Sequence, residues 1–288
     1  MLMRTIVANV GQSGHVFPTQ RASEQVPMPG TPDSAAAAPP SRRLVVQEVW
    51  LVFALSLGAS GVRALLDLLA DLANNVPLSK QSTALNVSQA PGHPWVDLSY
   101  QLFGIAVGVV PVLLVLHFLA RSGESRHDIG FDFRDRWRDL LRGACLAAVV
   151  GGAGLGLYLV AHASGANLTV VAEALPAVWW RIPVLVLSAA QNAVVEEVIV
   201  VGYLLRRLGQ LEWAWPSALA ASALLRGSYH LYQGLGGFFG NVVMGLIFCL
   251  LYRRWGRVGP LVAAHALIDT TAFVGYAVLA GHVSWLPT

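Results

Sequence analysis

The sequence predicts an all-α polytopic membrane protein, a bundle of about seven or eight transmembrane helices with a site between the later helices. Three observations predict this class. Hydrophobic residues make up 55% of the 288 residues and charged residues 12%, and the mean hydropathy is +0.58, which is far from the balance of a soluble domain. Apolar stretches long enough to cross a bilayer recur along the chain. Basic residues gather in alternate connecting segments.

Seven stretches are apolar over about 20 residues, the length that a helix needs to cross a bilayer. They cover residues 45–73, 95–119, 138–162, 181–205, 215–231, 236–254 and 258–280. The first stretch is the least regular, because Arg63, Asp67 and Asp71 interrupt it. The i, i+4 spacing of Arg63 and Asp67 predicts that they neutralise one another on one helix face.

The connecting segments predict how the chain is threaded. Arginines cluster before residue 44, at residues 121–142, at 206–207 and at 253–257. The alternate connecting segments hold only Lys80 and Arg181, and Arg63 and Arg226 lie within apolar stretches. Since basic residues favour the cytoplasmic side, we expect a multi-pass protein of the cell membrane with its N-terminus inside. The one lysine against eighteen arginines, with abundant Ala, Val and Gly, is typical of a bacterial protein, and hence of the plasma membrane.

The net charge of +3 reflects these basic loops, so it gives no reason to expect a nucleic-acid partner. Membrane lipids are the expected partners, and the basic segment 121–142 suits anionic headgroups. Residues 1–44 are rich in Pro, Ala, Ser and Gly, which predicts a disordered cytoplasmic tail. The transmembrane domain is expected to cover residues 45–288.

Five acidic and histidine side chains lie in the later apolar stretches, where burial of a charge is costly and usually functional. They are Glu196, Glu197, His230, His265 and Asp269. His265 and Asp269 are one helical turn apart on one face. A carboxylate that takes a proton from water, histidines that donate to a developing oxyanion and an acid that orients an imidazole together form a water-activating hydrolytic site.

The same residue types are also compatible with a metal. Two histidines and one glutamate, here His230, His265 and Glu196, can hold a divalent ion such as zinc and leave one position open for water. The residues alone do not separate this metal-dependent hydrolase from a glutamate-dependent one. The cofactor is therefore left open between a divalent metal and none.

Three short motifs carry a family resemblance over residues 180–275. They are "EEVIVV" from Glu196 to Val201, "RGSYH" from Arg226 to His230, and "HALID" from His265 to Asp269. Their order and spacing resemble those of the CAAX protease and bacteriocin-processing (CPBP, ABI) family of intramembrane endopeptidases, whose motifs are EExxxR, FxxxH and HxxxN or HxxxD. The resemblance implies hydrolysis of a peptide bond in a membrane-associated protein or peptide.

The resemblance also implies roles for the five residues. Glu196 would activate the water, and Glu197 would tune its charge or hold the structure. His230 would assist the water or the leaving group. His265 and Asp269 would polarise the scissile carbonyl. Whether a metal takes part is not specified by these motifs.

Two positions depart from the family pattern. Val201 stands where the first motif has arginine, and Arg226 stands where the second motif has phenylalanine. We hypothesise that the guanidinium has moved between helices, so that Arg226 neutralises Glu197; in the alternative, Arg226 extends to a lipid headgroup. Asp269, where asparagine is common, lacks an amide donor. It is therefore expected to orient His265 or to donate a hydrogen bond when protonated.

Two other functions are compatible with the same residues. The protein could be a catalytically silent binding or scaffold protein on this fold, or a small metal- or haem-binding transporter. One difficulty concerns the fifth stretch, because counting from residue 215 puts His230 about 22 Å deep, well below the glutamates. A bend in the glycine-rich segment 230–241 would correct this depth.

Overall fold

The computed structural model describes residues 40–284 and 286, within one compact unit from Ala37 to Thr288. Most of the predicted tail, residues 1–39, lies outside the described residues. The first helix begins at Arg42, so residues 42–44 are helical, although we had placed them in the tail.

Each of the seven apolar stretches contains helix, as expected from its hydropathy. The α-helices are α1 (Arg42–Ala54), α2 (Leu57–Ala73), α3 (Pro94–Arg121), α4 (Arg136–Ala163), α5 (Arg181–Glu196), α6 (Leu204–Gln210), α7 (Trp215–Ser228), α8 (Leu235–Trp255) and α9 (Gly259–Leu279). The shorter elements are the 3₁₀-turns η1 (Leu78–Lys80) and η3 (Leu231–Gln233), the π-helix η2 (Glu197–Tyr203), and the strands β1 (Ser82–Ala84) and β2 (Thr169–Val171).

The predicted count of seven membrane helices is not confirmed. Within the described residues, five helices are long and apolar enough to cross a membrane, or six if α1 and α2 together form one bent span. The fifth predicted stretch falls short because α7 has 14 residues, which rise about 21 Å against a hydrocarbon core of about 30 Å. The described residues thus form a multi-pass membrane protein in which α7 by itself is too short to cross the membrane.

The first predicted stretch is broken between α1 and α2, which are bent by 47°. The Ser56 hydroxyl donates to the carbonyl of Val52 and so occupies an acceptor that the break would leave without an intrahelical partner. Gly58 follows, and a Cβ there would lie 2.6 Å from the Phe53 carbonyl oxygen. The close approach at the bend therefore requires glycine.

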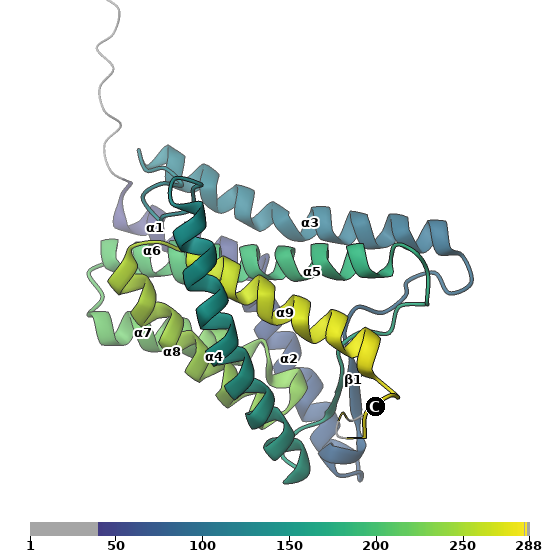
Figure 1. Ribbon diagram of the computed structural model, residues 1–288. Helices are drawn as coiled ribbons and strands as arrows, with labels where there is room; N and C mark the ends of the chain where they lie inside the picture. Colours follow the sequence, from purple (N-terminus) through teal and green to yellow (C-terminus); the bar gives the residue numbers. More distant parts are fainter. Residues whose placement is uncertain (1–39, 285, 287–288) are drawn as a thin grey trace, which may run out of the picture. The chain divides into compact units, whose positions relative to one another are not determined.

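The central element is the continuous helix α5–η2–α6, which runs from Arg181 to Gln210. In Figure 1, α3 runs alongside α5, α9 crosses in front of it, and α4 lies across α9. Helices α7 and α8 pack together as a hairpin. The residues of η2 are fully buried in the main apolar core, so the neighbouring helices surround the segment that carries the predicted glutamates.

Charged contacts join the basic loops at one end of the helices. Arg207, at the end of α6, lies 3.1 Å from Glu124 in the loop after α3. Arg257, between α8 and α9, lies 3.0 Å from Asp132 and 2.7 Å from Asp139, which belong to the loop before α4 and to its first turn. The three basic loops therefore meet at the same end, as alternate crossings of a membrane require.

Candidate active site

Glu196 and Glu197 lie at the junction where the α-helix α5 becomes the π-helix η2. The next four residues, 198–201, are all β-branched, and such side chains crowd the preceding turn of an α-helix. Inside the π-helix, the hydroxyl of Ser222 donates to the Val200 carbonyl at 2.8 Å. Single π-turns are frequent at functional sites, and this one sets the directions of both glutamates.

Glu197 is fully buried, and its Oε1 atom contacts two side chains, Arg226 and His265. The guanidinium of Arg226, on α7, forms an ion pair with Oε1. His265 Nδ1, on α9, lies 2.8 Å from the same oxygen. The second oxygen, Oε2, has no hydrogen-bond partner in the described part of the chain. The geometry thus places the Arg226 guanidinium against Glu197, between the helices that carry the three motifs.

Glu196 has a different environment, although it is the neighbouring residue. Its side chain is 11% exposed. The Tyr229 hydroxyl donates to Oε2 at 2.9 Å, and Arg226 Nη1 lies 3.9 Å from the same oxygen. Among the described residues no hydrogen bond reaches Oε1, so this oxygen can bind water. Sequence reasoning missed Tyr229, because nothing in its local pattern distinguishes it from an ordinary aromatic residue beside a histidine.

His265 lies between two carboxylates. Its Nδ1 faces Glu197 at 2.8 Å and its Nε2 faces Asp269 Oδ1 at 3.5 Å. An ionised carboxylate only accepts hydrogen bonds, so the ring satisfies both neighbours when it carries a proton on each nitrogen. On the other side of Asp269, the amide nitrogen of Asn192 lies 3.5 Å from Oδ2. Asp269 therefore contacts two N–H donors, both at long distance.

His230 lies in the turn between α7 and η3. Helix α7 ends at Ser228 and α8 begins at Leu235, after Gly234 with φ of 99°. The bend that we expected in the segment 230–241 is therefore present before α8. His230 Nδ1 lies 3.0 Å from the backbone oxygen of Arg226; because a carbonyl only accepts, Nδ1 carries the proton and Nε2 is an acceptor in the neutral ring.

One group in the described residues has the geometry to hold a metal ion: the ligand atoms of Glu196, Glu197 and His265 lie within 4.8 Å of one another. His230, which the sequence analysis included in the metal set, is not part of this group. Arg226 already provides a cation beside both carboxylates, and His265 Nδ1 is engaged by Glu197. A divalent ion at this group would therefore lie close to the guanidinium and share both carboxylates with it.

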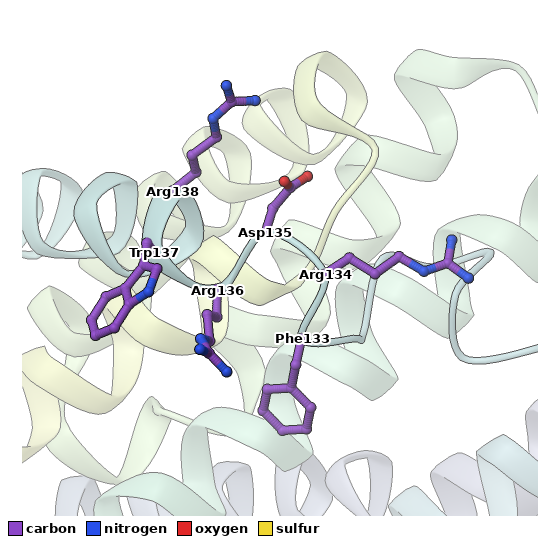
Figure 2. Close-up of a pocket in the computed structure, with 6 residues that line it drawn as sticks. All are labelled: Phe133, Arg134, Asp135, Arg136, Trp137 and Arg138. Atoms are coloured by element: carbon purple, nitrogen blue, oxygen red, sulfur yellow. The ribbon is translucent and has the colours of Figure 1, made fainter.

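A second feature with many charged residues lies away from this cluster. A hollow of about 380 Å³ opens at the beginning of α4, and Figure 2 shows the side chains that surround it. They are Phe133, Arg134, Asp135, Arg136, Trp137 and Arg138. The three arginine side chains point in different directions, so the hollow does not bring them together around a single ligand, and it contains none of the predicted catalytic residues.

The comparison with protein families agrees with the motifs. Residues 178–271 match the family model described as type II CAAX prenyl endopeptidase Rce1-like. This segment is therefore similar to that family. The match confirms the predicted resemblance to the CAAX protease family, and it runs from the loop before α5 into α9. No curated protein and no solved structure matches the chain.

The Rce1-like segment contains every residue of the cluster around the two glutamates. Glu196 and Glu197 come from its first helix, and Arg226, Tyr229 and His230 from α7 and the turn after it. His265 and Asp269 come from α9. Helices α1 to α4 lie outside the matched residues. An endopeptidase family thus covers the part of the chain where the acid and imidazole side chains converge.

Proposed function

We propose that the protein is an intramembrane endopeptidase in which Glu196 activates the attacking water. The main support is the difference between the two adjacent glutamates. Glu197 is fully buried and held by Arg226 and His265, whereas Glu196 is held by Tyr229 through one oxygen only. A general base needs a free oxygen within reach of water, and Glu196 has one.

In this proposal Glu196 Oε1 takes a proton from water as the water oxygen bonds to the carbonyl carbon of the scissile peptide. The electron pair of the C=O bond moves to the oxygen, where the Nε2–H group of His265 stabilises the negative charge. The C–N bond then breaks, and Glu196 returns the proton to the leaving nitrogen. His230 Nε2, an acceptor in the neutral ring, holds the second hydrogen of the water and so orients it.

Glu197 and Arg226 have a positioning role in this proposal. The guanidinium neutralises the buried Glu197, and Glu197 in turn fixes the proton of His265 on Nδ1. Asp269 faces the other ring nitrogen. The two carboxylates therefore favour the doubly protonated ring, which presents an N–H group to the substrate oxygen. The guanidinium replaces a metal as the fixed positive charge, and the proposed steps need no metal ion.

The substrate class follows from the similarity to CAAX prenyl endopeptidases. The proposed substrate is a peptide or protein held at the membrane, with a prenylated C-terminal CAAX peptide as the first candidate. A lipid anchor would bring such a peptide to a site that lies among transmembrane helices, since each buried methylene contributes about 0.8 kcal/mol to membrane binding.

The test uses the purified full chain in lipid vesicles and a fluorogenic farnesylated CAAX peptide, with the same peptide without the lipid as a second substrate. Glu196→Gln should lower kcat/KM at least about 10³-fold, because it removes the base while keeping the size of the side chain. The control is Glu212→Gln, which changes a glutamate whose side chain is 87% exposed. It should leave the rate unchanged. Turnover by Glu196→Gln would refute the role of Glu196.

The same preparation separates the alternative functions. A silent scaffold would cleave neither peptide, and substitution of the glutamates would leave its cellular phenotype intact. A transporter would contain stoichiometric metal or haem and would move solute across the vesicle membrane. In contrast, the endopeptidase should keep its full activity after treatment with a chelator, and metal analysis would verify that the treated protein is metal-free.

A further inference from the structure

Asn192 is an amide side chain in the membrane-spanning helix α5, half-buried and close to the proposed active site. Its Nδ2 atom lies 3.5 Å from Asp269 Oδ2, and this is its one hydrogen bond among the described residues. A contact of that length is weak. The Asp269 carboxylate therefore orients the amide, whose N–H groups can still donate a stronger hydrogen bond to a bound ligand.

The position of Asn192 relative to Glu196 is set by the helix. The two residues are one turn apart, at i and i+4, so their side chains leave the same face of α5, with Cβ atoms about 5–6 Å apart. Helix α9 packs against this face and brings Asp269 and His265 to it. The proposed base and the amide donor thus lie on one face, with about one helical turn between them.

Asp269 connects Asn192 with His265. One of its oxygens faces His265 Nε2 and the other faces Asn192 Nδ2, each at 3.5 Å. Hydrogen bonds of catalytic groups are often long before substrate binds and shorten in the complex. A substrate oxygen in the space between the two donors would accept from both, and Asp269 would keep both side chains oriented.

An ionised acid at position 269 leaves room for a second donor beside His265. An ionised aspartate accepts hydrogen bonds and cannot donate to an oxyanion, whereas an asparagine amide can. We propose that Asn192 supplies this amide donor: with His265, it binds the carbonyl oxygen of the scissile peptide bond and stabilises the charge that develops on it. This inference rests on the proposed function and adds to it a substrate-binding residue on α5.

The test compares Asn192→Leu with Gln191→Leu in the vesicle assay. Both variants replace a half-buried amide of α5 with an apolar side chain, but only Asn192 contacts Asp269. Loss of one oxyanion donor lowers kcat by about 10²–10³-fold, so Asn192→Leu should lose that much with KM changed less than about threefold. Gln191→Leu should retain the rate of the unmodified protein.

Binding of a farnesylated peptide aldehyde provides a readout that does not depend on turnover. Its hydrated carbonyl places an oxygen where the oxyanion would form, so Asn192→Leu should weaken its binding at least about tenfold. Gln191→Leu should leave that binding unchanged. Equal affinities of the two variants would overturn the inference, even if the protein cleaved no peptide and the proposed function failed.

An exchange of side chains gives a stricter test. Asn192→Asp should lose activity, and the double change Asn192→Asp with Asp269→Asn should regain at least about tenfold, because it restores one amide and one acid to the pair. If a folded double variant regained no activity, the reaction would not depend on an amide donor in this pair. The activity of the unmodified protein and its dependence on Glu196 are measured in parallel, so that failure of the proposed function is recognised separately.

Discussion

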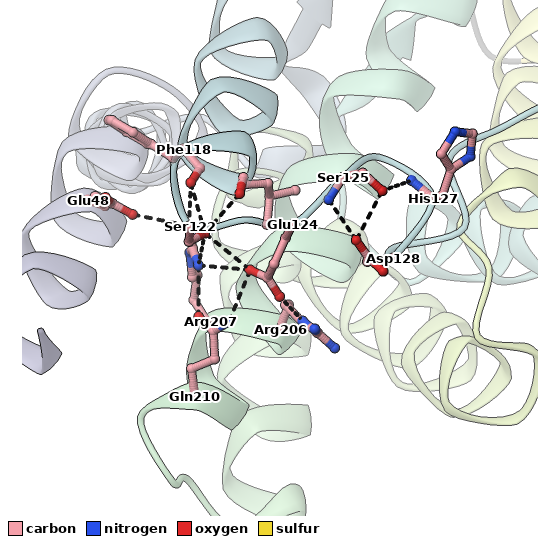
Figure 3. A network of polar contacts seen from close by, with 11 residues as sticks. Glu48, Phe118, Ser122, Glu124, Ser125, His127, Asp128, Arg206, Arg207 and Gln210 are labelled. Carbon is pink, nitrogen blue, oxygen red and sulfur yellow. Dashed lines mark hydrogen bonds and ion pairs between the residues drawn. The ribbon is translucent and has the colours of Figure 1, made fainter. Parts of the chain in front are cut away.

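Arg226 and Arg207 are both fully buried, and each lies beside two glutamates, yet their surroundings differ. Figure 3 shows Arg207 at the end of α6 with hydrogen bonds to several partners. These partners are Glu48, Phe118, Ser122, Glu124 and Gln210. Arg226 forms one hydrogen bond, to Glu197, and its Nε and Nη1 atoms have no hydrogen-bond partner in the described part of the chain.

The difference distinguishes the arginine at the proposed active site from one that joins helices elsewhere. Buried polar groups are nearly always paired. Arg207 approaches that rule, because in the described part of the chain only its Nε lacks a partner, while Nη1 and Nη2 join α1, the loop after α3 and α6. Arg226 does not, and neither does Glu197, whose Oε2 is also unpaired. Unsatisfied buried groups in a native structure are costly, so a cluster of them between α5, α7 and α9 is expected where a substrate or water binds.

The largest effect should come from Arg226→Gln. Glu197 would become a buried carboxylate without its cation, a change that typically costs about 3–5 kcal/mol. We also expect kcat/KM to fall at least about 10³-fold. Without the guanidinium, Glu197 would not stay ionised and could not hold the proton on His265 Nδ1. Thermal unfolding and peptide cleavage in vesicles measure the two losses.

A second variant shows whether activity depends on a cation beside Glu197 or on arginine at position 226 itself. Arg226→Phe combined with Val201→Arg restores the family pattern at both positions and moves the guanidinium back to the helix of Glu197. It should regain at least about tenfold over Arg226→Phe alone, since the two positions share one partner and are therefore coupled. Equal activities of the single and double variants would contradict the idea that one cation can be supplied from either helix.

Arg207→Gln should affect stability but not chemistry. Removing this guanidinium takes away the ion-pair partner of Glu48, whereas Glu124 keeps Arg206. We expect a loss of about 3 kcal/mol in the free energy of unfolding. The kcat of the folded fraction should stay within about twofold, since Arg207 contacts none of the proposed catalytic residues. A large fall in kcat at unchanged stability would erase the distinction between the two arginines.

The smallest effect is expected where Arg257 pairs with Asp132 and Asp139. Asp132 lies in a loop outside the membrane-spanning helices. Burial raises the pKa of Asp132, but hydrogen bonds from Arg257, His127 and the Arg134 backbone outweigh it and hold the pKa well below its usual range. A depressed carboxyl pKa contributes stability above the unfolded value of about 3.9 and loses it as the pH falls. The unfolding temperature of the unmodified protein should thus fall between neutral pH and pH values below 4. In Asp132→Asn this fall should be smaller, because the variant lacks the carboxyl group.

Hydropathy and motif spacing predicted much of this arrangement. The long helices α3, α4, α8 and α9 begin and end within a few residues of the predicted stretches, because about 20 apolar residues have few alternatives to a membrane helix. The length of α7 and the break at Ser56 were not predicted. Both depend on turns stabilised by local hydrogen bonds, which an average over hydropathy does not detect.

The sequence predicted which residues belong to the site, but not most of the hydrogen bonds between them. The sequence indicated that Glu197 needed a cation and singled out Arg226 as a candidate. It gave no signal for Tyr229 or Asn192, whose contacts with Glu196 and Asp269 join residues far apart in the chain. Nor did it predict the π-helix, since a run of β-branched residues is compatible with several helical forms. Tertiary packing decides these features.

The π-helix also has a consequence for rotation about the helix axis. A π-turn contains one residue more than an α-turn, so relaxing η2 to a regular α-helix would turn α6 relative to α5 by about 100°, the angle of one residue. Arg207 would then leave its partners, and Arg226 would no longer face Glu197. The buried pairs on the two sides of η2 therefore both depend on its π-helical geometry.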